Sequence, residues 1–240
     1  MKKVLYILTT ILILTDISYS ETALQFTQII DTPDQVIGAE ILKAAYKKLE
    51  IPIEIVTMPG KRALIESSEG RADGEIHRIF EIGNEYQTLV RVPTPINYIE
   101  PSVFSRKLNF NVAGCSELKD YHISIVRGVK HSELCTEGMK NVFIANNSSK
   151  MMKMLDAGGP DIIITARVNG LLLIKKMNLK SVFPLSPPLS RRLVYHYLHE
   201  KHKNIVPKIN KIFIEMKKNG ELKRLRDNTI KIMFKSAENK

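Results

Sequence analysis

The sequence predicts an α/β fold made of two similar lobes, each with a mainly parallel β-sheet flanked by helices. The first observation is the opening of the chain, where a strand-like stretch, a helical stretch and a second strand-like stretch follow one another. This βαβ order implies parallel strands joined by a helical crossover. The second observation is an echo: "SSEGRADGEIH" and "LDAGGPDIIIT" both run from a helix end through glycine to an aspartate and a strand. Two similar lobes follow from that repetition.

The N-terminal segment is expected to be an export signal, separate from the fold. Lys2 and Lys3 precede an apolar run from Val4 to Leu14, and Ser18 and Ser20 stand at signal-peptidase spacing. The run is shorter than the roughly 20 apolar residues that a membrane-spanning helix needs. Because no cysteine near the cleavage point offers a lipid anchor, we expect a periplasmic protein with no membrane insertion after cleavage.

The first lobe begins with a strand, a helix and a second strand. Thr32 can cap the helix and Pro33 suits its first turn, after which apolar residues share one face: Ile37, Ile41, Leu42, Ala45 and Leu49. The elements predicted here are strand 24–30, a helix from Thr32, strand 51–58, helix 60–69 ended by Gly70, and strand 72–79.

The same order starts again in the second lobe. Strand-like stretches at 122–126, 141–145, 161–165 and 181–185 alternate with helical stretches after Gly128, at 148–159 and at 168–177. The chain then ends with a strand-like stretch at 193–199, a helix closed by Gly220 and an amphipathic segment at 221–233.

The proline-rich stretch "FPLSPPLS" makes residues 183–190 a crossover by which the chain returns to the first lobe. A second crossover is expected near residues 103–109, which would complete a two-strand hinge. The predicted organisation is a signal at residues 1–20, lobe 1 at 21–106 and 190–240, and lobe 2 at 107–189.

The chain is basic, with a formal net charge of +11. The signal contributes +1, from Lys2 and Lys3 against Asp16, which leaves +10 for the mature chain. Such a balance favours anionic partners, whether small ligands, nucleic acid or a lipid surface, and the alternative is a solvated basic face. Nucleic-acid or surface binding would predict an affinity that collapses with salt. We expect a small-molecule partner and no nucleic acid.

Cys115 and Cys135 are the only cysteines in the sequence. An even pair in an oxidising compartment predicts a disulfide, whose loop closure would contribute on the order of 3 kcal/mol. The alternative is two separately buried thiols. A metal site is disfavoured because two cysteines without a paired histidine motif fall short of zinc ligation.

Four motifs in order resemble the extracellular solute-binding proteins of family 3, the periplasmic receptors of amino-acid-type ABC transporters. The motifs are "MPGKRAL" with "EGRADGEI", then "ISIVRG", "MLDAGGPDIII" and the ending "YHYLHEKHKNIVPKINKIFIEMKKNGELKRL". The resemblance covers nearly the whole mature chain. It implies a type II periplasmic binding protein-like fold, in which two lobes joined by a two-strand hinge close on a small ligand and lobe 1 is discontinuous.

Candidate ligand contacts follow from a rule of open α/β sheets. Ligands bind beyond the carboxyl ends of the strands, where helix N-termini aim N–H groups at anionic atoms. The rule marks residues 58–62, 78, 127–132 and 165–167. From these stretches, and from an aromatic residue after the "PTPI" segment, the candidates are Arg62, Arg78, Tyr98, Arg127, Gly128, Ser132 and Arg167.

Arg78 is the principal candidate, because a guanidinium there could hold a carboxylate through two parallel hydrogen bonds. The alternative is a salt bridge to Glu75, Glu81 or Glu85. Arg62 opposes the dipole of its helix, which is an argument for a functional role, and the alternative is an ordinary surface arginine. Ser132 could cap a helix beside a bound anion. Tyr98 could form a ligand wall or belong to the core.

The sequence departs from the usual amino-acid grip of the family. A threonine-x-x-arginine motif usually follows the first-lobe strand, and here that region reads "IFEIGNEY". An aspartate usually follows the strand equivalent to "DIIIT", and here Ala166 and then Arg167 stand there. An anionic or uncharged small molecule is therefore favoured over an ordinary α-amino acid, with Arg78 and Arg167 as replacements for the acid-binding group.

The predicted function is a monomeric, non-enzymatic receptor that captures a small polar ligand by hinge closure and delivers it to an inner-membrane ABC permease. The alternatives are a sensory module for a membrane receptor and a dehydratase-like enzyme on the same fold. Asp73 and Asp161 could suggest acid/base chemistry, but each stands at a strand entry, the end opposite the expected cleft. No cofactor or metal is expected, since no catalytic or phosphate-binding motif occurs in the sequence.

Overall fold

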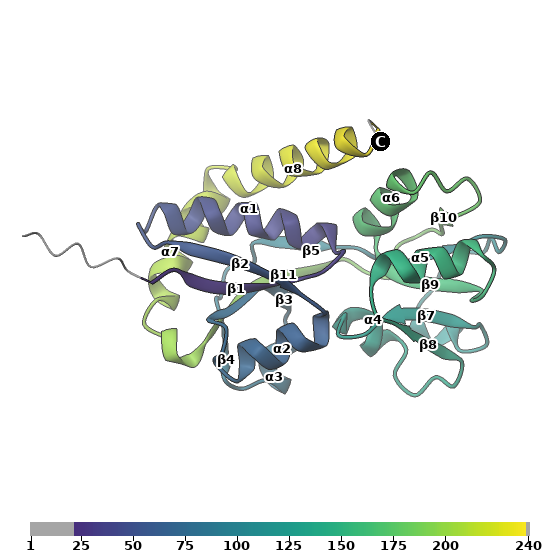
Figure 1. Cartoon of the computed structure of the whole chain (residues 1–240), viewed down its shortest axis with the longest axis horizontal. Coiled ribbons are helices and arrows are strands. Elements are labelled where there is room, and N and C mark those ends of the chain that lie inside the picture. Colours follow the sequence, from purple (N-terminus) through teal and green to yellow (C-terminus); the bar gives the residue numbers. More distant parts are fainter. Residues whose placement is uncertain (1–21, 239–240) are drawn as a thin grey trace, which may run out of the picture.

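The computed structural model describes residues 22–238, in two adjoining α/β lobes (Figure 1). The predicted signal at residues 1–20 lies outside the described residues. None of the helices between residues 22 and 238 is both long and apolar enough to cross a membrane.

Lobe 1 is built on a sheet in the order β2-β1-β3-β11-β4, with β5 also paired to β11. β1 runs parallel to β2 and β3, whereas β11 is antiparallel to its neighbours. The strands are β1 Leu24–Ile29, β2 Ile53–Met58, β3 Gly74–Ile79, β4 Leu89–Arg91, β5 Asn97–Ile99 and β11 Arg192–His199. The helices are α1 Pro33–Lys47, α2 Gly60–Ser68, α3 Ile82–Glu85, α7 Val206–Lys218 and α8 Glu221–Glu238.

Lobe 2 is built on a sheet in the order β10-β6-β9-β7-β8. β7 is parallel to β8 and β9, and β6 is antiparallel to β9 and β10. The strands are β6 Pro101–Ser105, β7 Ile123–Val126, β8 Val142–Ala145, β9 Ile162–Ala166 and β10 Phe183–Pro184. The helices are α4 Lys130–Cys135, α5 Ser148–Asp156 and α6 Arg167–Lys176. The two-lobed α/β fold predicted from the sequence is confirmed.

The chain crosses between the lobes at Glu100. β5 belongs to the first sheet and β6 to the second, and this single residue separates them. The crossover expected near residues 103–109 is therefore wrong, because every residue of β6 is buried in the second sheet beside β9. The return lies between β10 and β11, where it overlaps the predicted 183–190. The two passages meet where the N–H of Leu189 donates to the carbonyl of Pro101 over 2.8 Å.

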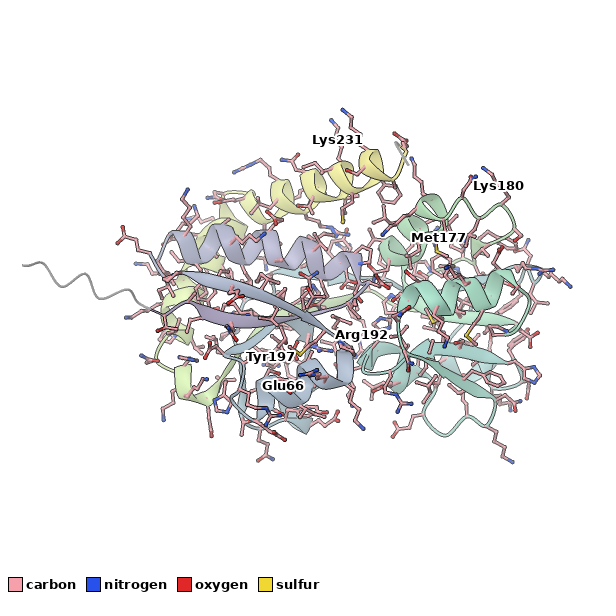
Figure 2. The ribbon with its side chains drawn as sticks, viewed as in Figure 1. Glu66, Met177, Lys180, Arg192, Tyr197 and Lys231 are labelled. Carbon is pink, nitrogen blue, oxygen red and sulfur yellow. A yellow bond between two sulfur atoms is a disulfide. The ribbon has the colours of Figure 1, made fainter. Side chains whose placement is uncertain are left out.

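Helix α8 links the two lobes along the top of the molecule. It lies beside α1 of lobe 1, and its last turns reach α6 of lobe 2 (Figure 1). Lys175 of α6 forms an ion pair with Glu238, and its ammonium group lies 5.7 Å from the centre of the Phe234 ring. Figure 2 shows the outer side of this region, where Lys180 and Lys231 point away from the ribbon.

The predicted disulfide is present. Cys115 lies in a short 3-10 helix, Cys115–Leu118, and is bonded to Cys135 at the end of α4. The bond ties the connection that leads from β6 to β7 onto the helix that follows β7. Cys135 packs against the apolar cluster beneath the second sheet.

The core of lobe 1 holds a buried histidine among aromatic rings. A shift in strand register between Tyr195 and Tyr197 turns His196 inward, with its ring centre 4.8 Å from that of Phe26. Its Nδ1 lies 2.7 Å from the carbonyl oxygen of Glu75, and its Nε2 lies 2.8 Å from the hydroxyl of Tyr46. A carbonyl only accepts, so Nδ1 carries the proton and Nε2 accepts from the Tyr46 hydroxyl.

The neutral state of His196 predicts a loss of stability in mild acid. Burial lowers the pKa of His196 to about 4. The unfolded chain, with a histidine pKa near 6.5, binds the proton first, so the free energy of unfolding should fall between about pH 6.5 and pH 4, by on the order of 3 kcal/mol. Urea denaturation across this range measures the slope.

The variant His196→Gln should lose part of that pH dependence, because the buried titrating group is gone. The exposed His122 supplies the matched control, and His122→Gln should keep the slope of the unchanged protein. Equal slopes in all three proteins would contradict this assignment.

Candidate functional site

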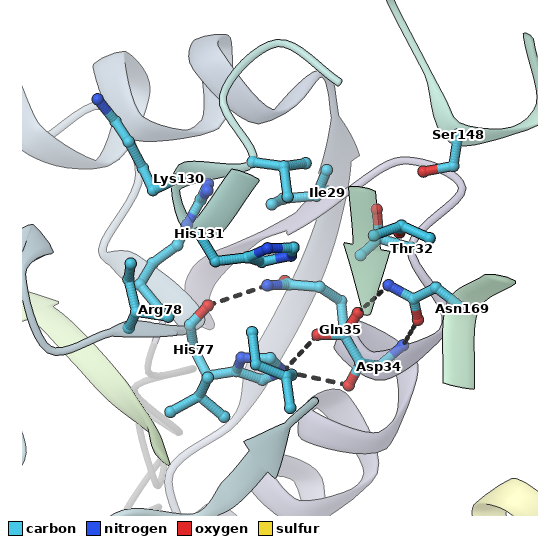
Figure 3. Close-up of a pocket in the computed structure, with 15 residues that line it drawn as sticks. Ile29, Thr32, Asp34, Gln35, His77, Arg78, Lys130, His131, Ser148 and Asn169 are labelled. Carbon is cyan, nitrogen blue, oxygen red and sulfur yellow. Dashed lines mark hydrogen bonds and ion pairs between the residues drawn. The ribbon is translucent and has the colours of Figure 1, made fainter. Parts of the chain in front are cut away.

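A small cavity lies between the two lobes, at the carboxyl ends of the central strands. Both lobes line it: lobe 1 contributes Thr32, Asp34, Gln35, His77 and Arg78, and lobe 2 contributes Lys130, His131, Ser148, Thr165 and Asn169. Apolar side chains, among them Ile29, Ile79 and Ile99, complete the wall. Figure 3 shows these side chains converging from several elements. The volume of about 40 Å³ leaves room for only a few water molecules.

The N-terminal turns of α1 and α6 meet across this cavity. The backbone N–H of Asp34 donates to Oδ1 of Asn169 over 2.8 Å, and the Asn169 amide donates back to the Asp34 carboxylate. Asp34 lies in the first turn of α1, where the helix dipole favours a negative charge. One pair of side chains on opposite lobes therefore closes this side of the cleft (Figure 3).

Gln35 and His77 form the floor on the lobe 1 side. The Gln35 amide donates to the carbonyl of His77 over 2.9 Å, and Nε2 of His77 lies 3.1 Å from the carbonyl of Asp34. Burial lowers the pKa of His77, so its ring is neutral, and Nε2 donates because a carbonyl can only accept. This leaves Nδ1 of His77 and Oε1 of Gln35 as buried acceptors with no protein partner among residues 22–238.

His131 and Lys130 face the cavity from lobe 2. His131 is buried, and burial together with the charge of Arg192 lowers its pKa to about 3. Its Nδ1 also lacks a partner within the described part of the chain. Lys130 reaches across to lobe 1, where its ammonium group lies 2.7 Å from the Glu85 carboxylate and 3.4 Å from Glu133 of its own helix.

Arg78 is buried at the back of the cavity and binds protein groups from both lobes. Its Nε donates to Oε2 of Glu75 over 2.9 Å, and Nη2 donates to Oε1 over 3.0 Å. Nη2 also donates to the carbonyl of Gly60 over 3.2 Å, and Nη1 to the carbonyl of Gly128 over 3.0 Å. Ser67 donates a further hydrogen bond to Glu75 over 3.0 Å. The alternative of a salt bridge to Glu75 is therefore what the structure contains.

The backbones of the two lobes come into direct contact at Gly128. This glycine has a φ of +79°, and a Cβ atom there would lie 2.1 Å from the nitrogen of Lys61 at the start of α2. Any other residue would clash with backbone, so glycine is needed both for the turn and for the close approach. The described arrangement is a closed one.

The family model of the bacterial extracellular solute-binding proteins, family 3, matches residues 17–231. The chain belongs to this family. No curated protein matches the sequence.

Solved structures with the same fold include both receptors and sensors. A histidine kinase sensor domain with similarity to periplasmic binding proteins has a TM-score of 0.75 at 17% identity, covering 87% of this chain and 96% of that one. The ligand-binding core of GluR0 in complex with L-glutamate has a TM-score of 0.75 at 14% identity, and the match covers 88% of this chain and 99% of that one. An amino acid ABC transporter substrate-binding protein from Streptococcus pneumoniae, bound to L-arginine, has a TM-score of 0.68 at 14% identity. The match covers 82% of this chain and 84% of that one.

Of the candidate residues predicted for this family 3 protein, only Arg78 and Gly128 are hydrogen-bonded to each other in the structure. The other candidates lie at separate places. Arg62 and Arg127 are exposed, and Arg62 lies 3.5 Å from Glu66 on its own helix. Ser132 donates to the carbonyl of Val129 within its own turn. Arg167 contacts the return passage near the carbonyl of Leu185, and Tyr98 lines a different cavity. Their ligand roles stay predictions.

Sequence reasoning missed several polar residues of the cavity, among them Asp34, Gln35, His77 and Asn169. Lys130 and His131 lie in a marked stretch but were not chosen as candidates. The rule of strand carboxyl ends, applied to the turn after β1, would have marked Asp34 and Gln35. His77 was missed because it lies within β3, and burial cannot be read from alternation in a strand that is buried on both faces. Asn169 stands in the first turn of α6, just beyond the marked stretch.

The two aspartates considered for acid/base chemistry have structural roles. Asp73 accepts the backbone N–H of Gln25 over 2.7 Å and lies 2.6 Å from Nε2 of His202. Asp161 accepts the backbone N–H of His122 over 2.9 Å. Within residues 22–238, no group of three or more histidine, cysteine, aspartate or glutamate side chains could hold a metal ion.

The Glu75–Arg78 pair predicts a large stability cost on truncation. Arg78→Ala leaves the Glu75 carboxylate buried without its partner, which should lower the free energy of unfolding by about 3–5 kcal/mol. The double variant Glu75→Gln with Arg78→Met should recover part of that loss. Urea denaturation at neutral pH measures both.

Arg62→Ala is the matched control, because Arg62 is exposed and its ion pair with Glu66 is a surface one. Its cost should stay below about 1 kcal/mol. If Arg78→Ala costs no more than Arg62→Ala, the buried pair does not organise the site.

Proposed function

We propose that the protein is a solute receptor that captures a small polar ligand in the cavity between its lobes. The observation that supports this most directly is that three residues lining the cavity each carry a buried polar atom with no partner among residues 22–238, namely Oε1 of Gln35, Nδ1 of His77 and Nδ1 of His131. Buried polar atoms are normally hydrogen-bonded, so these atoms call for a partner that is not part of the chain. They come from both lobes, as a ligand bound by hinge closure requires.

The chemistry of the wall favours an uncharged ligand with hydroxyl or amide N–H donors. Gln35 and His77 offer acceptors, and the Asp34 carboxylate stands beside them. Arg78 donates to Glu75 and to two backbone carbonyls, so its charge is already matched. Sequence reasoning left an anionic and an uncharged ligand open, and the acceptors favour the uncharged one.

The size of the cavity requires the lobes to move apart. Ligand sites usually measure roughly 300–1,000 Å³, and this closed cavity offers about 40 Å³. Binding of any solute larger than a few atoms needs a more open state, after which contacts to both lobes would favour closure. Glu100 and the return passage provide the hinge.

We propose an ABC permease as the receiving partner, with a membrane sensor as the second candidate. Family membership supports delivery to a transporter. The sensor candidate is supported by the direct contacts that hold the lobes closed, since a closed cleft can serve as a signalling state in its own right. A permease gene or a kinase gene beside this one would distinguish the two.

The contact between Asp34 and Asn169 predicts a way to open the cleft. Asn169→Asp places a second carboxylate against Asp34 and removes the amide donor, so repulsion should separate the lobes. Small-angle X-ray scattering should show a larger radius of gyration for this variant. The exposed Asn141, also in lobe 2, gives the control Asn141→Asp, whose radius should not change. An unchanged radius in Asn169→Asp would mean that this pair does not hold the closed state.

A thermal-shift screen tests the ligand proposal. The mature protein is screened against polyols, amides, amines, amino acids and organic acids, where a hit stabilises in proportion to RT ln(1 + [L]/Kd). We expect the hits among the uncharged donors. Calorimetry should then show affinity for the best hit reduced about tenfold in Gln35→Leu, the equivalent of one hydrogen bond to a buried acceptor.

The control is Gln87→Leu, which removes an exposed glutamine of lobe 1 and should leave affinity unchanged. Hits confined to organic acids would overturn the uncharged assignment. Turnover of a screened compound, without stabilisation by any, would overturn the receptor proposal itself.

A further inference from the structure

A second cavity lies on lobe 1, apart from the one between the lobes. Its volume is about 330 Å³, and none of its lining residues is shared with the interlobe cavity. It is bounded by β5, by the start of β11 and by the adjoining ends of α7 and α8. Tyr98, predicted as a ligand wall for the cleft, stands here.

Two guanidinium groups stack on the ring of Tyr98. The central carbon of Arg191 lies 3.6 Å from the ring centre, and that of Arg226 lies 4.0 Å from it. Nη1 of Arg226 also donates to Oδ1 of the buried Asn97 over 3.1 Å. Stacking and this hydrogen bond fix the two planar groups before any ligand arrives, so binding them to an oxyanion loses little side-chain freedom.

Positive charge dominates the cavity. Its wall holds four cations, Arg191, Lys217, Lys223 and Arg226, and one carboxylate, Asp227, which lies 2.6 Å from Lys223. The other three cations have no carboxylate within salt-bridge distance in the part of the chain that the structure describes. Cations held together without counter-charges repel one another, and a bound anion would relieve that repulsion.

The wall between these cations is apolar. Ile96 and Leu222, both buried, and Leu193, which is 48% exposed, line the cavity. An inorganic ion would leave this surface in water, whereas a ligand with a hydrocarbon body would cover it.

We propose that this cavity binds a small organic oxyanion, a phosphate monoester or a carboxylate attached to an apolar body. Arg191 and Arg226 hold the oxyanion, and the apolar wall takes the body. The site does not depend on the proposed function of the interlobe cavity.

Calorimetry with four probes tests the proposal on the mature protein: phenyl phosphate, benzoate, inorganic phosphate and benzyl alcohol. Phenyl phosphate should bind most tightly, benzoate and inorganic phosphate should bind more weakly, and benzyl alcohol should show no binding. Arg191→Gln and Arg226→Gln should each weaken phenyl phosphate about tenfold or more, the loss expected for a charge-assisted hydrogen bond.

Arg224→Gln is the matched control, because Arg224 is an exposed arginine of the same helix outside the cavity wall. Its affinity for phenyl phosphate should stay within about twofold of the unchanged protein, since the substitution removes one charge and one hydrogen bond to the carbonyl of Asn219, both outside the cavity wall. If Arg224→Gln and Arg226→Gln weakened phenyl phosphate binding equally, the attraction would come from the net positive charge of the region, and the proposed site would be wrong. Failure of phenyl phosphate to bind at millimolar concentration would overturn it as well. Circular dichroism confirms that each variant is folded.

Discussion

The buried ion pair of Glu75 and Arg78 is the interaction on which the closed arrangement depends. Both residues lie on β3, and the guanidinium reaches the carbonyl of Gly60 in lobe 1 and that of Gly128 in lobe 2. A buried pair contributes little net stability when its desolvation is counted, but it fixes geometry because every alternative leaves a charge without partners. Here the geometry that it fixes is the approach of Gly128 to the start of α2.

The interlobe contacts set what a ligand must supply. The Asp34–Asn169 and Lys130–Glu85 contacts already favour closure without any solute. A ligand shifts the equilibrium only by its differential affinity for the closed state. Under the proposed function, the unpartnered atoms of Gln35, His77 and His131 would provide that difference, because a solute hydrogen-bonded to them gains bonds that exist only when the lobes enclose it.

Local pattern predicted the elements well, and the rule of strand ends located the cavity. The helix α1 was predicted from the Thr32 cap and its apolar face, and β9 from an unbroken apolar run. The side chains that line the cavity were harder to predict. Candidate residues were chosen for their positive charge, and several of these arginines, such as Arg62, face solvent. The pairing of Arg78 with Glu75 was also hard to predict. The two residues are three positions apart on one strand, and strand alternation would place them on opposite faces. The crossover was placed one strand too late because β6 resembles any buried strand in sequence.

The two cavities lie on opposite faces of the β5–β11 pair, because Tyr98 and Leu193 line one cavity whereas the next residues, Ile99 and Val194, line the other. Tyr98 lies two residues before the crossover at Glu100, and Arg191 is the last residue of the return passage before β11. An anion held by Arg191 against Tyr98 would therefore rest on both hinge segments at once, near the point where they turn into lobe 2. Coupling to the interlobe cavity would require the anion to bind the open and closed states with different affinity, and any such coupling is reciprocal. Because β5 and the start of β11 are hydrogen-bonded to each other, a rotation about Glu100 must be absorbed beyond them, at the contact of Leu189 with Pro101. The anion would then stiffen the fixed side of the hinge, against which that rotation takes place.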